Sequence, residues 1–397
     1  MSRQSKLNTP AFISCPFCAM VCDDLSLPAH SEPTRSPEIS CEKARSGFSD
    51  ALRATRKTPL IHGKEATWEQ ALKQAARMLA NASHPLIDGL IGDLLDCKAA
   101  ARLAENFGGT IDHLHGNAIA RNLRIYQQGG WLISSMGEVR NRADLVILVG
   151  EELEATHPRL QEKLFESPER LHASAPPAIH QLGHDCLDLL SVVRARLADK
   201  PVQSDITGSD ELITQLSASV YPVFVIGCLP EQSAELIIRT CIGLVRDINE
   251  TRRAALLILG SGEGDTTAQL GTTWNNGFGI RTSHARGFPE QDLEMHAGSR
   301  LLESGEADLL VWISSLSTSP PPQVRQSTLV FGHPAMVFTH GPPDIFLPVG
   351  VPGIQRAGYL HRADGLRMVP LHKLVDSTLP GSITLCEHLI SQEPRTC

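Results

Sequence analysis

The heptapeptide Asp144-Leu145-Val146-Ile147-Leu148-Val149-Gly150 is an unbroken apolar run between a carboxylate and a glycine. Such a run is typical of a strand buried on both faces, as in a parallel sheet covered by helices. Further apolar runs lie at 85–92, 222–227, 254–260, 308–313 and 327–332, and helical periodicity at 68–79, 93–107, 231–252 and 292–304. This alternation predicts an α/β fold with two Rossmann-like parallel-sheet layers.

The chain has 397 residues, more than one hydrophobic core usually serves. We expect a cysteine-rich N-terminal segment over 1–60 and α/β domains over 61–205 and 206–346. A C-terminal segment rich in glycine and proline, 347–397, should pack on both domains, and its first part, 347–373, should be irregular. The polar stretch 194–210 and the proline run at 319–322 are the predicted linkers.

Composition and charge narrow the classes of partner. The formal net charge is −8, from 36 basic and 44 acidic residues, so no overall positive field attracts nucleic acid or an anionic membrane. No apolar run has the length of a membrane span, and residues 1–14 lack the apolar core of a secretory signal. We therefore expect a cytoplasmic protein, in which clustered cysteines stay reduced and bind metal rather than form disulfides.

Four cysteines near the N-terminus have the spacing of metal ligands: Cys15-x2-Cys18-x3-Cys22-x18-Cys41. Four thiolates fit either a zinc ion or a [4Fe-4S] cluster. The compact triplet favours the cluster, because structural zinc usually takes two separated pairs. Zinc, a motif that no longer holds metal, and ordinary buried thiols remain the alternatives.

Two other patterns are weaker. His113 and His115 have the spacing of some zinc ligands, but no further ligand set is evident in the sequence, so we treat the pair as coincidence. The string 260–264, Gly-Ser-Gly-Glu-Gly, follows an apolar run but completes no phosphate-binding motif. It predicts a tight turn from a strand to a helix.

The cysteine cluster ending in Cys41-Glu42-Lys43 resembles the N-terminus of the molybdopterin oxidoreductases. Within that superfamily the chain resembles the B subunit of formylmethanofuran dehydrogenase, and the likeness spans most of the sequence in order. The segments that carry it are Leu114-His115-Gly116, the string GEVRNRAD at 137–144, His157-Pro158-Arg159, and the segments 273–278, 286–289 and 352–365.

The resemblance implies a [4Fe-4S] cluster held by the four cysteines, and a molybdenum or tungsten ion on two pterin dinucleotides. In that family a cysteine ligates the metal, a histidine follows it, and a distant arginine completes the site. Here Leu114 occupies the cysteine position and has no donor atom. His115 is retained, and Arg286, in Arg-Gly-Phe-Pro, is the candidate arginine. Both are expected to be vestigial catalytic residues.

Two further differences from the family's sequence pattern argue against binding of a bis-pterin cofactor. Carboxylates at 151, 152 and 154 replace the family's Asn-Pro, where a pyrophosphate would approach. The segment 180–186 shows no recognisable nucleotide-binding turn.

The resemblance favours one branch, the B subunit of the bacterial formyltransferase/hydrolase complex. That complex acts in tetrahydromethanopterin-dependent one-carbon metabolism, in which formaldehyde is oxidised to formate through a methanofuran-type carrier. The implied partners are its hydrolase, formyltransferase and C-type subunits. The formyl-to-formate step is a hydrolysis, so this chain would be a scaffold without redox chemistry. Two alternatives remain: a redox-active tungsten or molybdenum formylmethanofuran dehydrogenase subunit using His115 and Arg286, and a zinc-binding α/β module.

Overall fold

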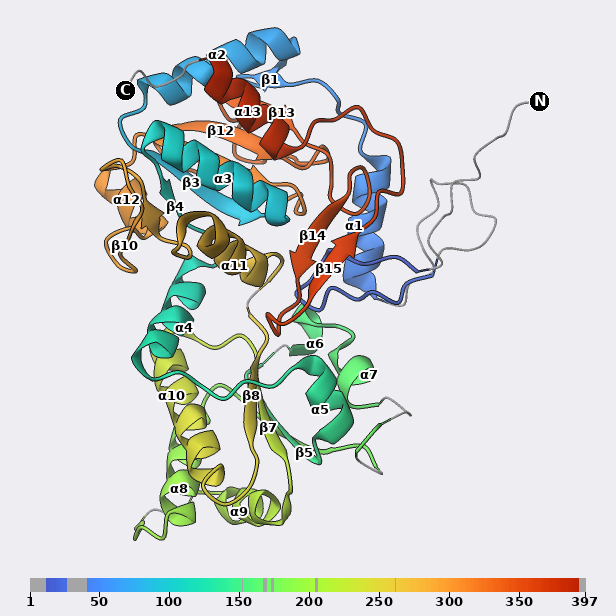
Figure 1. The fold of residues 1–397 in the computed structure, drawn as a ribbon, viewed down its shortest axis with the longest axis vertical. Helices are drawn as coiled ribbons and strands as arrows, with labels where there is room; N and C mark the ends of the chain where they lie inside the picture. Colours follow the sequence, from blue (N-terminus) through green and yellow to red (C-terminus); the bar gives the residue numbers. More distant parts are fainter. Residues whose placement is uncertain are drawn as a thin grey trace, which may run out of the picture.

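The computed structural model describes residues 12–26, 41–151, 153–166, 170–172, 175–203, 206–260 and 262–392. Within these residues, one nine-stranded sheet and one four-stranded sheet form two stacked units, and a two-stranded hairpin lies beside them (Figure 1). Helices cover both sheets. The predicted α/β fold is therefore confirmed.

The larger sheet has a parallel centre and antiparallel edges. The central strands, β4, β3, β11, β12 and β13, run parallel, whereas β9 and β10 at one edge and β1 and β2 at the other are antiparallel. In spatial order the strands are β10 (Glu290–Gln291), β9 (Thr282–Ser283), β4 (Thr110–Ile111), β3 (Pro85–Ile91), β11 (Leu309–Ser314), β12 (Ser327–Gly332), β13 (Ile345–Pro348), β1 (Leu60–Ile61) and β2 (Lys64–Glu65). Helices α2 (Trp68–Asn81), α3 (Leu94–Phe107) and α13 (Ser382–Gln392) pack together and share a core with this sheet.

The smaller sheet is entirely parallel. Its strands are β6 (Ala178–Leu182), β5 (Leu145–Val149), β7 (Pro222–Ile226) and β8 (Ala255–Ile258), in that order. Its helices are α5 (Met136–Arg142), α6 (Leu153–Thr156), α7 (Leu160–Leu164), α8 (Leu187–Leu197), α9 (Ser209–Ala218) and α10 (Glu231–Ile248). None of the helices in the described residues is long and apolar enough to cross a membrane.

The smaller unit is inserted into the larger one. The chain leaves the large sheet after β4 through α4 (Gly116–Gly129) and returns through α11 (Asp265–Asn276) (Figure 1). The predicted boundary at 205/206 separates β6 from β7, which belong to the same sheet, and the boundary at 346/347 falls inside β13. The predicted division into domains is therefore corrected: apolar runs locate strands, but they do not say which strands pair.

Several predicted elements differ at their ends. The helix expected over 292–304 is α12 (Gly298–Ser304), because the Asp292 side chain accepts the backbone N–H groups of Glu294 and Met295 in a turn. The segment 347–373 is not wholly irregular, since it contains the hairpin β14 (Gly358–His361) and β15 (Met368–Leu371).

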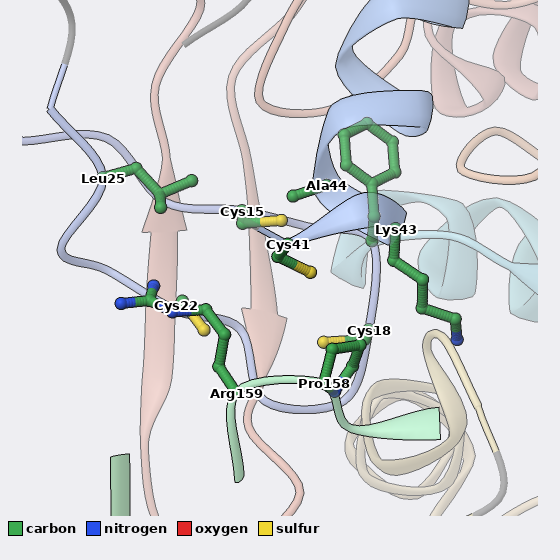
Figure 2. Close-up of a pocket in the computed structure, with 10 residues that line it drawn as sticks. Cys15, Cys18, Cys22, Leu25, Cys41, Lys43, Ala44, Pro158 and Arg159 are labelled. Atoms are coloured by element: carbon green, nitrogen blue, oxygen red, sulfur yellow. The ribbon is translucent and has the colours of Figure 1, made fainter. Parts of the chain in front are cut away.

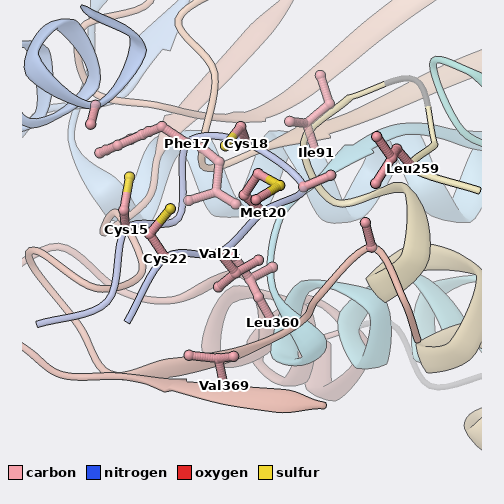
Figure 3. Close-up of a cluster of buried hydrophobic side chains, with 14 of the residues drawn as sticks. Cys15, Phe17, Cys18, Met20, Val21, Cys22, Ile91, Leu259, Leu360 and Val369 are labelled. Carbon is pink, nitrogen blue, oxygen red and sulfur yellow. The ribbon is translucent and has the colours of Figure 1, made fainter. Parts of the chain in front are cut away.

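The N-terminal loop is part of the core. Backbone hydrogen bonds between Ile13 and Leu25, at 2.7 and 3.2 Å, close a loop that contains the first three cysteines. Phe17, Met20 and Val21 are buried from this loop against side chains of the hairpin and the large sheet (Figure 3). Apolar packing thus anchors this segment in addition to any bond that its cysteines make.

A buried ion network joins the C-terminal segment to α3. Asp93 and Asp96 cap α3 reciprocally, and the Arg356 guanidinium donates to both carboxylates at 2.9 to 3.0 Å. Burial and the neighbouring Asp96 raise the pKa of Asp93 to about 6, although Arg356 opposes this rise. A Cβ at Gly358 would lie 2.2 Å from Asp93 Oδ2, so the hairpin can approach only with glycine at that position.

We expect Arg356→Ala to lower the free energy of unfolding by about 3 kcal/mol, because it leaves two buried carboxylates without their cation. Urea denaturation measures the loss. The matched control is Arg367→Ala, which removes a half-exposed ion pair with Asp23 and should cost less than about 1 kcal/mol. Equal losses in the two variants would contradict the assigned role of the network.

Candidate functional site

The structure brings the four predicted cysteine ligands together. Cys15, Cys18 and Cys22 lie on the N-terminal loop, and Cys41 immediately precedes α1 (Glu42–Arg53). All four thiols are buried around a small cavity, toward which their sulfur atoms turn (Figure 2). Phe17, Leu25, Lys43, Ala44, Pro158 and Arg159 complete its wall.

Three of these thiols, Cys15, Cys18 and Cys22, resist ionisation because burial raises their pKa. Burial, followed by the neighbouring Cys18, raises the pKa of Cys15 well above that of an ordinary thiol. Burial and Cys22 raise the pKa of Cys18 to about 12, although Lys43 opposes this rise. Because a thiolate, not a thiol, ligates metal, a bound centre must supply the positive charge that stabilises four thiolates here.

Two cations flank the cysteine cavity. Lys43 forms an ion pair with Glu263 at 3.0 Å, which links the cysteine loop to the turn before α11. The Arg159 guanidinium donates to both Asp24 carboxylate oxygens at 2.9 Å. The motif at 157–159 therefore places an arginine and a proline directly at the thiols.

A second cavity, of about 500 Å³, lies where the large sheet meets the inserted unit. His113, Leu114 and His115 line it from the segment between β4 and α4, and the side chain of Leu114 is 48% exposed. Asp88 and Trp312 line it from β3 and β11. This is the cavity in which the resemblance would place the pterin-bound metal.

Asp265 holds His115 in place. His115 Nδ1 lies 2.9 Å from Asp265 Oδ1, and Asp265 Oδ2 accepts the Gly262 N–H at 2.9 Å. Burial lowers the pKa of His115, but the hydrogen bond to Asp265 and the negative charges of Asp265 and Glu263 together outweigh burial, and the net pKa is raised. Asp265 begins α11, so the glycine-rich string is the predicted strand-to-helix turn, and it also positions a carboxylate.

His113, His115 and Asp265 place three ligand-type atoms within 4.8 Å of one another. His113 Nδ1 accepts the His115 backbone N–H at 2.9 Å, so neutral His113 carries its proton on Nε2, the atom that faces Asp265 at 3.7 Å. A nitrogen that carries a proton cannot bind a metal ion. In the tautomer that these contacts favour, the three side chains form a polar cluster around Asp265, and the interpretation of the histidine spacing as coincidence stays a prediction.

Two carboxyl groups face each other deeper in the cavity. Asp112 Oδ2 accepts the Gly298 N–H at 2.7 Å and lies 3.3 Å from the Arg281 guanidinium. Burial and the adjoining Asp112 carboxylate raise the pKa of Asp88 to about 7. The Asp88 carboxyl therefore keeps its proton to a higher pH than an ordinary aspartate does.

The structure does not bring Arg286 to His115. The Arg286 side chain is 72% exposed, pairs with Glu290 at 3.0 Å and does not line the cavity. Arg281 and Arg121 line it instead. The prediction relied on a four-residue motif match, and nothing in the sequence marked Arg281, five residues earlier, as the arginine inside.

The carboxylates at 151–154 are described in part. Glu151 Oε1 lies 2.7 Å from His184 Nδ1, so this carboxylate pairs with a histidine of the following turn. Glu152 lies outside the described residues.

Comparison with known proteins agrees with the resemblance predicted from the motifs. No established protein-family profile matches the chain. The chain is 24% identical to the B subunit of the tungsten-containing formylmethanofuran dehydrogenase 2 of Methanocaldococcus jannaschii, over 92% of this chain and 93% of that one. The fold and the sequence thus confirm a similarity to the B subunits of formylmethanofuran dehydrogenases.

A more particular likeness is to the Fhc B subunit of the formyltransferase/hydrolase complex of Methylorubrum extorquens. The two chains are 27% identical over 76% of this chain and 87% of that one. A solved structure of the M. extorquens formyltransferase/hydrolase complex with methylofuran contains a chain of the same fold. Its TM-score is 0.73 and its identity is 23%, covering 84% of this chain and 98% of that one.

The two cavities differ in how well they fit the cofactors that the resemblance implies. Four convergent thiols fit a metal centre with thiolate ligands. In the large cavity, Leu114 offers no donor atom at the position that the resemblance gives to the metal-binding cysteine.

We expect Asp88→Asn to reduce the pH dependence of stability. A raised carboxyl pKa means that the folded state binds the proton more tightly, so stability is lost as pH rises from about 4 to about 7. From pH 5 to pH 8, the free energy of unfolding of the variant, measured by urea denaturation, should rise by at least about 1 kcal/mol relative to that of the wild type. The exposed control Asp376→Asn should show the same pH profile of stability as the wild type. If Asp88→Asn also showed the wild-type profile, the raised pKa of Asp88 would be refuted.

Proposed function

We propose that this chain is the B subunit of a formyltransferase/hydrolase complex in tetrahydromethanopterin-dependent one-carbon metabolism. In that role it is a cytoplasmic scaffold without redox chemistry of its own. Its partners are the hydrolase, formyltransferase and C-type subunits. The observation that carries the proposal is Leu114, a residue without a donor atom at the position of the family's metal-binding cysteine.

The surroundings of Leu114 support the same conclusion. His115 points a ring nitrogen at Asp265, and two carboxyl groups occupy the floor of the cavity. Negative charge of this kind opposes the approach of pterin pyrophosphates. Conversion of a formyl group to formate by water moves no electrons, so a complex that performs it needs no redox metal in this subunit.

The redox-active alternative draws on the retained His115 and on the similarity to tungsten-containing relatives over more than nine-tenths of the chain. It requires tungsten or molybdenum to be held without the cysteine ligand. The two functions therefore differ in metal content and in pterin content.

Affinity purification of the full chain from its native cells tests the proposal. We expect formyltransferase, hydrolase and C-type chains to co-purify, and less than about one-tenth of a tungsten or molybdenum atom per chain. Mass spectrometry identifies the chains and any released pterin. Stoichiometric tungsten or molybdenum with pterin would establish the redox alternative, and a solitary monomer would overturn the assembly.

We further propose that Cys15, Cys18, Cys22 and Cys41 hold a [4Fe-4S] cluster. The four thiols are buried around one cavity, as ligands of a single centre would be. Structural zinc usually takes two separated pairs of cysteines, so the compact triplet Cys15, Cys18 and Cys22 supports the larger centre over zinc.

When bound, such a cluster can pass single electrons, but this chain has no metal ligand at position 114 to receive them. Its contribution here is structural. It ties the loop carrying the first three cysteines to the start of α1, next to the apolar contacts of Phe17 and Met20.

We expect Cys18→Ala to abolish iron binding while the two sheets remain folded, because Phe17, Met20 and Val21 still anchor the loop. Iron and acid-labile sulfide analysis with an absorption spectrum, on anaerobically prepared protein, measures the loss. Cys186→Ala, which removes a buried thiol outside the cluster, should retain full iron. Unchanged iron in Cys18→Ala, or one zinc per chain in the wild type, would refute the cluster.

A further inference from the structure

A third cavity, of about 460 Å³, lies in the smaller unit at the amino ends of β7 and β8. Val220 and Tyr221, which lead into β7, line it together with Arg253 and Ala254, which lead into β8. Leu229, which follows β7 and so lies beyond its carboxyl end, lines the large cavity instead. The third cavity is therefore at the opposite end of this sheet, and among the described residues it shares no lining residue with the four-cysteine cavity or the large cavity.

Asp144 fixes the turn that leads into β7. Its carboxylate accepts hydrogen bonds from the Ser219 hydroxyl at 2.6 Å and from the backbone N–H groups of Val220 and Tyr221 at 2.6 and 2.8 Å. The turn held in this way presents Val220 to the cavity, and the side chain of Val220 is 74% exposed. The carboxylate of Asp144 is taken up by these donors and does not line the cavity.

Apolar side chains form much of the lining. A short extended segment runs beside β8, because the Leu256 N–H donates to the Leu132 carbonyl oxygen at 2.8 Å and the Ser134 N–H donates to the Leu256 carbonyl oxygen at 2.7 Å. This segment brings Leu132 and Ile133 to the cavity, where they are 50% and 49% exposed. Tyr221 adds a half-buried aromatic ring. Exposed apolar side chains that gather at one cavity are typical of a binding site.

The charges of the lining indicate an anionic ligand. Arg142 pairs with Glu138 at 3.3 Å, and Glu138 supplies the only carboxyl group among the described lining residues. Arg253 makes no hydrogen bond or ion pair with any residue in the part of the chain that the structure describes. One guanidinium group is therefore neutralised and the other is free. A guanidinium group matches the two oxygens of a carboxylate, whereas a phosphate carries about twice the charge of one guanidinium group.

The planar groups of the cavity favour a flat ligand. The Arg142 Cζ atom lies 6.0 Å from the centre of the Tyr221 ring, so a guanidinium plane and a phenol ring lie beside each other. Aromatic rings gain from contact with both kinds of group beyond the area that they bury. An aromatic ring is therefore preferred here to an aliphatic chain of similar size.

We propose that this cavity binds an aromatic carboxylate, with the carboxylate on Arg253 and the ring against Tyr221 and Leu132. A volume of about 460 Å³ lies within the range of small-molecule sites, roughly 300–1,000 Å³. The site is independent of the proposed function, because binding requires neither a metal centre nor a partner chain.

The probe for the test is 2-naphthoate, which carries one carboxylate on a flat apolar ring system. Isothermal titration calorimetry with the full chain at pH 8 compares it with 2-naphthamide, a neutral analogue of the same shape, and with acetate, which lacks the ring. We expect 2-naphthoate to bind at least about 10-fold more tightly than 2-naphthamide and at least about 100-fold more tightly than acetate.

Variants assign the contacts. Arg253→Met, which keeps the apolar stem, should weaken 2-naphthoate at least about 10-fold and leave 2-naphthamide unchanged. Val220→Glu adds a carboxylate at an exposed position of the lining and should weaken 2-naphthoate at least about 3-fold. The matched control, Arg325→Met, removes an exposed guanidinium group outside the cavity and should bind as the wild type does.

Val220→Glu decides the case if Arg253→Met does not fold. Equal binding of 2-naphthoate and 2-naphthamide would overturn the proposal, as would undiminished binding of 2-naphthoate by folded Arg253→Met.

Discussion

The attachment of the C-terminal segment to helix α3 depends on one guanidinium group between two buried carboxylates. Arg356, from the C-terminal segment, forms ion pairs with Asp93 and Asp96 at the start of α3. Its pKa is raised above its ordinary value because the two carboxylates outweigh the effect of burial. The hairpin that follows Arg356 packs against the cysteine loop, because Leu360 and Val369 share one apolar cluster with Val21 (Figure 3).

The two cavities use buried charge in opposite ways. In the four-cysteine cavity, burial raises the pKa of the Cys15, Cys18 and Cys22 thiols, and Lys43 and Arg159 line the same cavity. Such a site gains most from a polycationic centre that neutralises several thiolates at once. In the large cavity the buried groups are already acidic, and Leu114 supplies no ligand atom. The chain therefore gathers four thiols in one cavity, whereas position 114 in the other cavity carries no donor atom.

Much of the fold could be predicted from local patterns. The apolar runs gave the central strands of both sheets, and the spacing of the cysteines gave their convergence. Pairing between distant strands could not be predicted, because β5 and β7 are nearly identical in character to β11 and β12 and any of them could pair. The site shows the same limit: Asp265 lies 150 residues from His115, and neither residue signals the other.

The sequence by itself determined the α/β class, the spacing of the four N-terminal cysteines and the absence of a donor at position 114. These properties depend on residue type and on short spacing, which folding does not change. Only the tertiary structure decided that one unit is inserted into the other, that Arg281 rather than Arg286 lines the cavity, and that Asp88, Asp112 and Trp312 face one space. These features come from the register of parallel strands, and sheet hydrogen bonding sets that register between segments more than 200 residues apart.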